Sequence, residues 1–493
     1  MGALRTRRGR GAGPAILSAR LVRQVSLAAD SKGEIAARFD GHSVVLGKFS
    51  AGTADRAQVL RTGLPLDSLR SRGRGIEKEL DFLVRRLARH GLLEYCLERS
   101  GTDQVVIEPQ VPDYWPQSRQ PGEADILALS RFAYMRRRGN DFVLESPCAG
   151  ALFRICDATI AADIATLSVP RPLKELTRQH GFAGLALVGL LLDSHILFKI
   201  DPARGRGPRW AEGDDELVLW DFHDLLFHAR SSEGRHANPL GGIYAYASAI
   251  AAPPAVRPRW PGKKIDLRKL AHSPSFSRAA KLLRQRHSTR SFDDRRPISL
   301  AELARFLDGA ARVQSKFTSP LGDGDPVVTY AARPYPSAGG SYGLELYLAV
   351  DKCKGLVRGF YHYDAGAHAL VSIGVRASEL DVLFAGAKLA MGAAAVPQIV
   401  ITVAARFSRT SWKYSSIAYA LVLKDVGVLM QTLYLMATDL GLGGCAIGIA
   451  NIDLFAKMTG IEFHIEGPVG QFALGRAANP RYPTSVRRRV GIR

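Results

Sequence analysis

Two short segments of the chain carry residue types that bind an anion and move a proton. The first is Arg286-His287-Ser288-Thr289-Arg290, in which two guanidinium groups stand four residues apart with a serine between them. Guanidinium groups bind phosphate oxygens in pairs, and a serine hydroxyl adds a short neutral donor. The second is Lys413-Tyr414, an amine beside a phenol that can relay a proton. The first segment therefore predicts a phosphate site and the second an acid–base site.

Two glycine-containing segments would let backbone groups come close to a flat ligand. Pro336-Ser337-Ala338-Gly339-Gly340 precedes an expected strand at 344–350, and the glycine-dense segment 441–448 follows an expected helix at 417–440. Glycine leaves the backbone amides uncovered because no side chain stands in the way. Together with the arginine pair, these segments favour a flat cofactor that bears a phosphate, and FMN fits that description.

Each segment also has an ordinary structural interpretation. An isolated R-x-S-x-R is commonly a solvated basic helix end, which the helix dipole stabilises. The PSAGG segment alone is typical of a turn, and Lys413-Tyr414 could cap the helix that follows. The occurrence of all these segments in one chain favours the cofactor site over the separate structural explanations.

In their order along the chain, RHSTR, PSAGG and GLGGCAIG resemble the flavin-dependent nitroreductase fold. Arg333-Pro334-Tyr335-Pro336-Ser337, the segment 359–364 and above all Lys413-Tyr414 resemble the SagB/ThcOx-type branch of azoline dehydrogenases more narrowly. In that branch a Lys-Tyr pair stands by the FMN of enzymes that oxidise thiazolines or oxazolines in ribosomally made peptides. The resemblance implies an intertwined homodimer with the flavin at the subunit interface.

The resemblance also implies roles for single residues. Lys413 and Tyr414 are the expected catalytic pair, with the lysine desolvated beside the flavin, and which of the two abstracts the proton stays open. The expected ligands of the ribityl chain and phosphate of FMN are Arg286, Ser288, Arg290 and Arg476. Ser337, Ala338 and Gly339 are expected at the pyrimidine end of the ring, and Ala446, Ile447 and Gly448 are expected to supply a backbone donor to its central nitrogen. The remaining expected cofactor-binding residues are His287, Pro336 and Gly444.

The leading hypothesis is an FMN-dependent dehydrogenase that turns azolines into azoles in a ribosomal peptide and passes the electrons to dioxygen. One alternative keeps the flavin but reduces nitro compounds or quinones with NAD(P)H. Another is a non-catalytic scaffold that binds a peptide or nucleic acid. The expected partners of the enzyme are a precursor peptide, a cyclodehydratase and a second copy of the chain.

Composition is compatible with this hypothesis. The 493 residues are 46% hydrophobic and 23% charged, which is typical of a globular protein of about two to four domains. The net charge of +21 predicts an anionic partner such as an acidic leader peptide, with nucleic acid or a membrane surface as other options. Five widely spaced cysteines without a C-x-x-C pair argue against a disulfide framework and a zinc site. We expect a cytoplasmic protein without a transmembrane segment.

The first half of the chain contains an internal repeat. Leu83-Val84 with Leu87 and Leu92 recurs as Leu187-Val188 with Leu191 and Ile196, and each copy ends a helix and enters a strand. After a disordered basic tail at 1–20, we expect tandem winged-helix-like modules at 21–112 and 125–215. Peptide binding is favoured over DNA binding because the helix expected at 185–192 carries no charge.

The second half alternates helices and strands. A connecting helix and a proline-rich linker at 216–264 precede a nitroreductase-like FMN domain at 265–493. There Ser299 and Glu302 form a capping box at the start of a helix. The predicted strands lie at 344–350, 359–373 (a hairpin), 398–403 and 471–474, and the predicted helices at 378–390 and 417–440. The fold class is therefore α+β.

Overall fold

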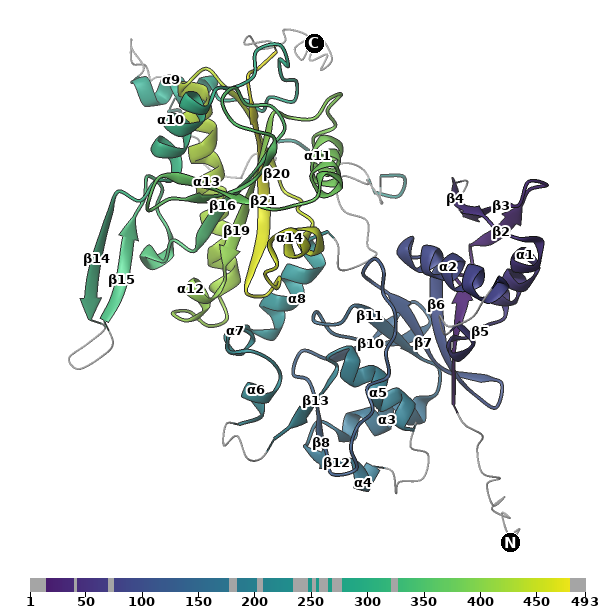
Figure 1. Ribbon diagram of the computed structural model, residues 1–493. Coiled ribbons are helices and arrows are strands. Elements are labelled where there is room, and N and C mark those ends of the chain that lie inside the picture. Colours follow the sequence, from purple (N-terminus) through teal and green to yellow (C-terminus); the bar gives the residue numbers. More distant parts are fainter. Residues whose placement is uncertain are drawn as a thin grey trace, which may run out of the picture. The chain divides into compact units, whose positions relative to one another are not determined.

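The computed structural model (Figure 1) describes ten stretches of the chain: residues 15–39, 42–69, 75–176, 184–201, 207–233, 247–250, 254–256, 265–267, 277–320 and 327–478. Residues 1–14 of the tail predicted at 1–20, and most of the proline-rich linker, lie outside the described residues. The chain divides into two compact units, Met1–Arg230 with Gly234–Ala237, and Ser231–Glu233 with Asn238–Arg493. Each unit is described by itself.

The C-terminal unit is built on a six-stranded sheet in the order β18-β17-β16-β19-β21-β20. All neighbouring strands are antiparallel. Its strands are β16 (Leu344–Val350), β17 (Gly359–Asp364), β18 (Ala369–Ile373), β19 (Ile399–Arg406), β20 (Gly443–Ile447) and β21 (Glu466–Gly475). The predicted strands and the predicted hairpin are confirmed.

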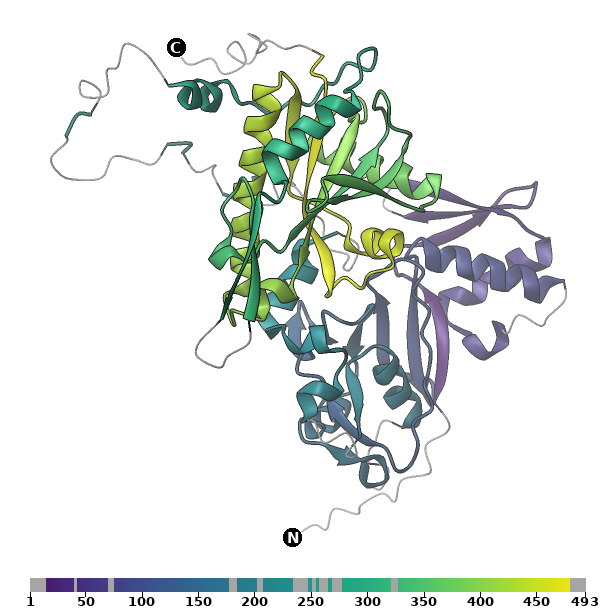
Figure 2. The same ribbon diagram turned by 60° about the vertical axis from the view of Figure 1, so that its left-hand side comes forward.

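Helices cover both faces of this sheet (Figure 2). The helices of the unit are α9 (Arg278–Gln285), α10 (Leu300–Ala311), α11 (Ala377–Met391), α12 (Ser408–Ser411), α13 (Ala418–Asp439) and α14 (Ile452–Thr459). On one face α13 contacts β16, β20, β21 and α10. On the other, Tyr347 and Val400 of the sheet share a buried core with Leu383 of α11 and Phe455 of α14. Alternate strand residues therefore serve opposite faces.

The capping box predicted for α10 is present. The Ser299 hydroxyl accepts from the Glu302 N–H at 3.3 Å, and the Glu302 carboxylate accepts from the Ser299 N–H at 2.9 Å. Each of these two hydrogen bonds satisfies a backbone N–H at the start of the helix that has no partner within the helix. The signal was local in sequence, which is why it could be read without the fold.

Helix α13 is long and strongly apolar. Among the described residues it is the one helix that could cross a membrane by length and composition, with a mean hydropathy of 1.4 and 39% of that window buried. Its buried side, which includes Val422, Leu429 and Leu433, packs on the sheet and on α10. We therefore interpret α13 as a core helix of the C-terminal unit.

A two-stranded hairpin of the C-terminal unit was not predicted. It consists of β14 (Ser315–Pro320) and β15 (Val327–Ala332), which pair with each other and extend from the six-stranded sheet (Figures 1 and 2). Most of its side chains are exposed, although Phe317 and Tyr330 stack with ring centroids 5.5 Å apart. Such a hairpin lacks the apolar alternation that marks a half-buried strand in a sequence.

The N-terminal unit contains a seven-stranded sheet in the order β5-β1-β6-β7-β11-β10-β9 and a small sheet of β12, β8 and β13. The strands are β1 (Ile16–Leu21), β5 (Leu64–Pro65), β6 (Leu93–Arg99), β7 (Thr102–Pro109), β8 (Ile126–Leu129), β9 (Tyr134–Arg138), β10 (Asp141–Glu145), β11 (Ala151–Ile155), β12 (Arg171–Pro172) and β13 (Leu197–Ile200). β6 and β7 form an antiparallel hairpin. Strands of both expected modules share the large sheet.

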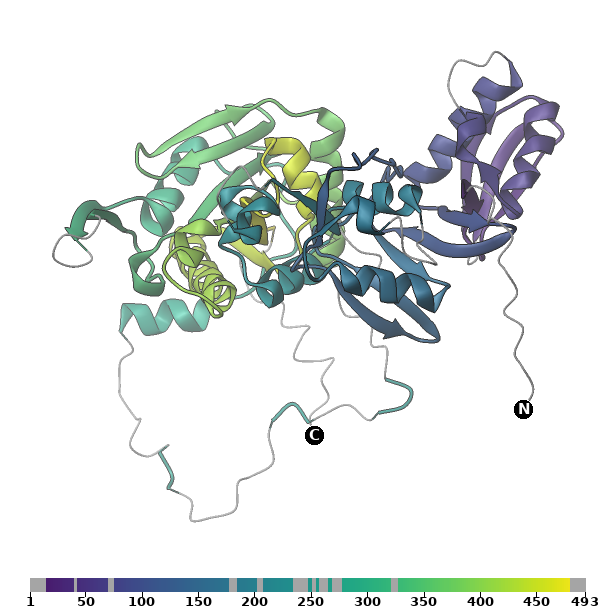
Figure 3. The same cartoon turned by 90° about the horizontal axis from the view of Figure 1, so that it is seen from below.

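A second small sheet, β2 (Ser26–Ala29), β3 (Glu34–Phe39) and β4 (His42–Lys48), was not predicted. The helices α1 (Ala51–Ala57) and α2 (Ile76–Arg89) pack together beside it (Figure 3). The predicted tail at 1–20 also ends too late, because β1 begins at Ile16 and pairs with β6 along its whole length.

The internal repeat is confirmed at the level of secondary structure. Leu83, Val84 and Leu87 are buried in α2, which leads into β6, and their counterparts Leu187, Val188 and Leu191 are buried in α5 (Leu185–Asp193), which leads into β13. The other helices of the unit are α3 (Ala158–Thr166), α4 (Leu173–Leu176), α6 (Pro208–Ala211), α7 (Asp215–Val218) and α8 (Phe222–Ser231). The winged-helix assignment and the module limits stay predictions.

Candidate functional site

The RHSTR segment lies against the first residues of β20. Ser288 and Gly444 form a bridge, and the Thr289 N–H donates to the Gly444 carbonyl at 2.8 Å. A Cβ at Gly443 would stand 2.6 Å from the Thr289 side chain, and one at Gly444 would collide with the Phe472 ring. These glycines let the two segments touch. The RHSTR segment and the glycine-dense strand therefore lie in direct contact.

Tyr434 of α13 joins these segments, and the sequence had not singled it out. Its hydroxyl lies 2.8 Å from the Ser288 hydroxyl and accepts from the Ala446 N–H at 2.8 Å, while the Arg286 guanidinium stands 5.1 Å from its ring centroid. A hydroxyl has one proton and two acceptor positions. When Tyr434 donates to Ser288, the Ser288 proton remains for a third acceptor, such as a phosphate oxygen.

Three residues that were predicted to bind FMN contact other parts of the protein. The Ala446 N–H, expected to face the flavin's central nitrogen, is bonded to Tyr434, and the Ile447 side chain belongs to the core between sheet and helices. Arg476, expected to bind phosphate, donates to both oxygens of Glu302 at 2.6 and 2.8 Å. Gly448 is exposed. The pattern of residues in the sequence could not show that these groups contact other groups of the protein.

The Arg476–Glu302 pair has an electrostatic consequence. Partial burial raises the pKa of Glu302, but hydrogen bonds from Arg476 and Ser299 outweigh it and hold that pKa at about 2. Nearby, burial raises the pKa of the Cys445 thiol, and Arg290 partly offsets this rise. Arg476 therefore anchors the start of α10 to the end of β21.

The PSAGG segment is held by a carboxylate of α13. Asp425 is buried and accepts from the Ser337 hydroxyl at 2.6 Å and from the Ala338 N–H at 3.0 Å. The Ser337 hydroxyl in turn accepts from the Tyr342 N–H at 2.9 Å. Lys424, the residue before Asp425 in α13, is exposed. Pro336 is exposed at the start of the same turn.

Lys413 and Tyr414 lie directly over Gly339. The Lys413 Nζ donates to the Gly339 carbonyl at 3.1 Å, and it stands 5.6 Å from the Tyr330 ring centroid. A Cβ at Gly339 would lie 2.6 Å from this Nζ and would collide with the Tyr414 hydroxyl. Gly339 has a φ of 52°, a conformation that glycine adopts without strain. The fold thus brings the expected catalytic pair onto the PSAGG turn.

The surroundings of this lysine differ from the expectation. Lys413 is exposed in the single chain, so the predicted desolvation is wrong for the chain by itself. The pair does not cap α13 either, because that helix begins at Ala418 with Ile417 as its N-cap. A short helix, α12, ends just before the pair and leaves it in a loop.

A cavity of about 360 Å³ opens at the phosphate end, and its lining residues include His287, Thr289, Tyr434, Gly441 and Gly444. His287 Nδ1 lies 3.0 Å from the Gln285 carbonyl, and Arg290 is exposed nearby. Arg286, Ser288 and Arg290 are not among the residues that line this cavity. The two guanidinium groups and the serine hydroxyl of this one segment nevertheless suit a phosphate. The donor set at this end therefore fits the cofactor that the sequence suggested, without Arg476.

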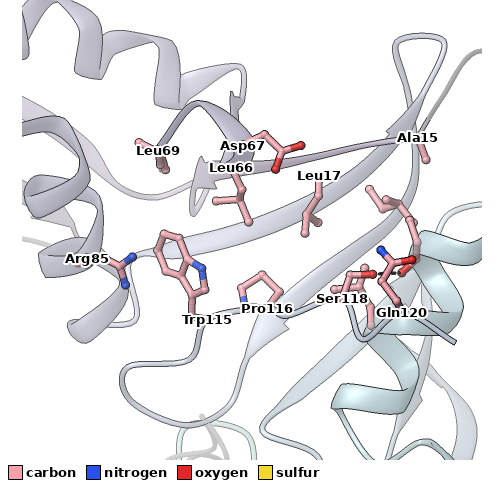
Figure 4. A pocket seen from close by; sticks show the side chains of 13 residues that line it. Ala15, Leu17, Leu66, Asp67, Leu69, Arg85, Trp115, Pro116, Ser118 and Gln120 are labelled. Carbon is pink, nitrogen blue, oxygen red and sulfur yellow. Dashed lines mark hydrogen bonds between the residues drawn. The ribbon is translucent and has the colours of Figure 1, made fainter. Parts of the chain in front are cut away.

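The N-terminal unit has a larger cavity of about 1040 Å³ (Figure 4). Leu17, Leu66, Trp115 and Pro116 face the same opening, and the Arg85 guanidinium stands 4.6 Å from the Trp115 ring centroid. Beside it, β1 has an edge that the described residues cover only in part, since β5 pairs with Ser18 and Ala19 alone. Asp67 also lines the cavity, which therefore combines an apolar surface with one cation and one carboxylate.

Comparison with known proteins identifies the C-terminal unit. The family description "Nitroreductase family" matches residues 283–476, and "Cyanobactin oxidase ThcOx" matches residues 127–237. MJ1384 of Methanocaldococcus jannaschii, provisionally named a nitroreductase, is 32% identical over 152 residues, which are 31% of this chain and 69% of that protein. The chain belongs to the nitroreductase family. The resemblance to its SagB/ThcOx-type branch is confirmed by the second match.

Solved structures are also similar to part of this chain. The Escherichia coli microcin synthetase McbBCD complex with truncated pro-MccB17 includes a chain that is 18% identical, with a TM-score of 0.39, and the match covers 54% of this chain and 97% of that one. A provisionally named nitroreductase of Desulfovibrio desulfuricans in complex with FMN is 15% identical, with a TM-score of 0.27, covering 43% and 95%. By family membership, this nitroreductase-family chain is an oxidoreductase.

All five cysteines lie in the described part of the chain, and no disulfide joins any of them. Cys96, Glu98 and Asp103 bring potential metal-ligand atoms within 4.8 Å of one another. Arg20 lies among them and pairs with Asp103 at 3.1 Å, and burial raises the pKa of the Cys96 thiol to about 12. A cation beside a thiol that stays protonated opposes metal binding. We assign no metal to this cluster.

Proposed function

We propose that this chain is an FMN-dependent dehydrogenase that converts thiazoline or oxazoline rings into thiazoles or oxazoles in a ribosomally made peptide. The contact of Lys413 and Tyr414 with Gly339 carries the proposal, because it brings an amine and a phenol onto the turn expected beside the flavin ring. The match to a cyanobactin oxidase supports a peptide substrate.

The chemistry divides between the cofactor and the protein. Aromatisation of an azoline removes a proton from one ring carbon and a hydride from its neighbour. Bound FMN supplies the hydride acceptor, and dioxygen is the terminal oxidant. Arg286, Ser288 and Arg290 would hold the phosphate, and Lys413 or Tyr414 would take the proton. Because Lys413 is exposed in the single chain, the bound substrate or a second subunit must exclude water from it.

Two measurements test this proposal. The absorption spectrum of the purified protein should show bound flavin. A peptide that carries azolines should then become lighter by two hydrogens for each ring, and the variants Lys413→Ala and Tyr414→Phe should lower kcat by about 100-fold or more while FMN stays bound. A yellow protein that leaves the peptide mass unchanged would refute the dehydrogenase.

The name of the MJ1384 relative favours one other reaction, the reduction of nitro compounds or quinones by NAD(P)H. Here Lys413 and Tyr414 would have no proton to abstract, so their variants would retain activity. Rapid bleaching of the flavin by NAD(P)H, without oxidation of an azoline peptide, would establish the reductase and exclude the dehydrogenase.

We infer that the cavity of the N-terminal unit binds the acidic leader of the precursor peptide by adding a strand beside β1. Leu17 and Trp115 would hold apolar side chains, and Arg85 would attract the acidic ones. Arg85→Glu should weaken the binding of a labelled acidic leader in a fluorescence assay about tenfold or more. Arg89→Glu is the matched control, because Arg89 lies one turn further along α2 and is more exposed. Equal loss in both variants would contradict a local site.

We also propose that two copies of the chain associate through the exposed side of α13. The exposed residues of that side are Ala420, Lys424, Gly427, Val428 and Gln431, and the N-cap Ile417 is exposed as well. The side is therefore small and apolar except at Lys424 and Gln431. Val428→Arg should shift the mass measured by light scattering from dimer to monomer. Leu389→Arg, on the exposed side of α11, should leave it unchanged. A monomeric wild-type protein would refute the dimer, and binding to vesicles would favour a membrane surface as the partner of α13.

A further inference from the structure

A second cavity of the C-terminal unit, separate from the one at the phosphate end, lies at the base of the β14–β15 hairpin. Its volume is about 590 Å³, and its walls come from β15, the loop after it, β16, β17 and the end of β19. Tyr330, Arg333, Ser341, Glu345 and Arg406 are among the lining residues. Two segments that carried the family resemblance line it, one through Arg333 and the other through His362 and Asp364, although neither had been assigned to a site.

Two buried donors that line this cavity have no partner among the described residues. They are the Ser341 hydroxyl, in a residue that is 4% exposed, and the Nε of Arg333, whose side chain is 8% exposed. A buried polar group without a hydrogen bond costs free energy, so such groups indicate a ligand. Arg409 donates to the Ser341 carbonyl at 3.1 Å and fixes this part of the loop.

The carboxylates of the cavity, by contrast, are engaged. Glu345 faces His362 at 3.4 Å, Arg406 at 3.7 Å and Arg333 at 3.8 Å. Glu466 accepts from the Tyr347 hydroxyl at 2.7 Å, and Asp364 accepts from two backbone N–H groups at 2.9 Å. The unused hydrogen-bonding capacity therefore belongs to donors, and Arg406, which is 50% exposed, adds a cation at the rim. A ligand that complements this cavity brings acceptors and negative charge.

The cavity borders the candidate catalytic pair. Tyr330 lines it, and the Lys413 Nζ stands 5.6 Å from the Tyr330 ring centroid. A Cβ at Gly340, next to the Gly339 turn, would lie 3.5 Å from the same ring. One aromatic ring thus separates the cavity from Lys413, a gap that an extended peptide crosses within about three residues.

We propose that this cavity binds a carboxylate of the substrate peptide, carried within about three residues of the ring that is oxidised. The inference rests on the proposed function for the identity of the ligand as a peptide. The carboxylate could belong to an acidic side chain or to the C-terminus of the peptide, since both present the same group to Ser341, Arg333 and Arg406.

The experiment measures binding without turnover, using short fluorescent peptides whose thiazole is already formed. One pair has Glu or Gln beside the ring and an amidated C-terminus, and the other has a free or amidated C-terminus and no acidic side chain. Wild-type protein should bind the acid of one pair about tenfold tighter than its amide, and the pair that discriminates identifies the source of the carboxylate.

Two variants test whether the preference for the acid over the amide depends on this cavity, and a third variant serves as the control. Arg406→Gln and Ser341→Ala should each reduce the preference of acid over amide, and Ser341→Ala removes no hydrogen bond formed within the described chain. Arg305→Gln changes the same charge at an exposed position of α10 and should retain the preference. Equal affinity for acid and amide in the wild type, or a preference that survives both variants, overturns the proposal.

These outcomes differ from a failure of the proposed reaction. If the wild type prefers the acid over the amide but does not oxidise an azoline peptide, the carboxylate site is supported and the proposed dehydrogenase activity is refuted. If oxidation proceeds and the wild type binds acid and amide equally, the dehydrogenase stands and the carboxylate site falls.

Discussion

Helix α13 contributes to two polar clusters, one around Asp425 and one around Tyr434. The clusters differ in whether their hydrogen-bonding groups are all satisfied within the chain. At Asp425 a buried carboxylate is satisfied by Ser337 and Ala338, and it closes a turn of the backbone. At Tyr434, about 13 Å further along the helix axis, a neutral hydroxyl links Ser288 to Ala446, while the nearby Arg290 stays exposed. The first cluster is complete without a ligand, and the second keeps donors for one. We infer that the Asp425 end maintains shape and the Tyr434 end binds the cofactor.

The strongest test of this comparison concerns the turn that Asp425 holds. Gly339→Ala would place a methyl group against Lys413 and Tyr414 and displace both. We expect azoline oxidation to fall about 100-fold, because small displacements of catalytic groups are that costly, while bound FMN measured by absorbance is retained. Gly340→Ala is the matched control, since its φ of 68° imposes similar strain but its nearest neighbour lies 3.5 Å away. A similar loss in both variants would mean that strain alone is responsible.

The second prediction concerns the carboxylate itself. Asp425→Ala leaves the Ser337 and Ala338 donors buried without an acceptor, and should lower the free energy of unfolding by about 3 kcal/mol in a denaturant titration. Asp425→Asn keeps one acceptor oxygen and should cost about half as much. Asp439→Ala, on the same helix, breaks an ion pair with the exposed Arg278 and should cost less than about 1 kcal/mol. Equal costs at both aspartates would contradict the structural role of Asp425.

A third prediction uses Arg476, which was expected at the phosphate but pairs with Glu302. The folded-state pKa of Glu302, about 2, lies below its ordinary value of 4.5, so its stabilisation is present above pH 4.5 and is lost as the pH falls towards 2. We expect a contribution on the order of 2 kcal/mol, after allowance for solvent screening. Glu302→Gln should flatten the dependence of unfolding free energy on pH in that window. Unchanged FMN affinity in Arg476→Gln would confirm that this arginine is structural. A large loss of FMN affinity would instead indicate that Arg476 binds the phosphate.

The smallest expected effect lies at the Tyr434 end. Tyr434→Phe removes the hydroxyl that orients Ser288, and FMN affinity measured by titration of the apoprotein should weaken about tenfold. Unfolding free energy should change by about 1 kcal/mol, less than at Asp425. Tyr361→Phe is a control that removes a hydroxyl bonded to the Val357 carbonyl. If Tyr434→Phe binds FMN as the wild type does, the hydroxyl relay plays no part in holding the cofactor.

Prediction from the sequence was most successful in the C-terminal unit. Its strands and helices have long apolar patterns, and the capping box at Ser299 is a local signal. In the N-terminal unit the sheet of β2, β3 and β4 was missed, and strands of two expected modules were found in one sheet. The burial of β3 alternates, with Ile35 and Ala37 buried, but Ala36 between them is apolar too, so the sequence shows no clear alternation from which to predict the strand.

Within the site, the sequence identified the segments, and the fold identified their partners. The types of Arg286, Ser288, Lys413 and Tyr414 already specified phosphate and proton chemistry, because these properties belong to the side chains themselves. That Asp425 and Tyr434 organise those segments, and that Arg476 is bound to Glu302, depended on contacts between residues far apart in the chain. Hydrogen-bond partners and burial arise only when distant elements pack together, so the tertiary structure alone decided which predicted groups remain free for a ligand.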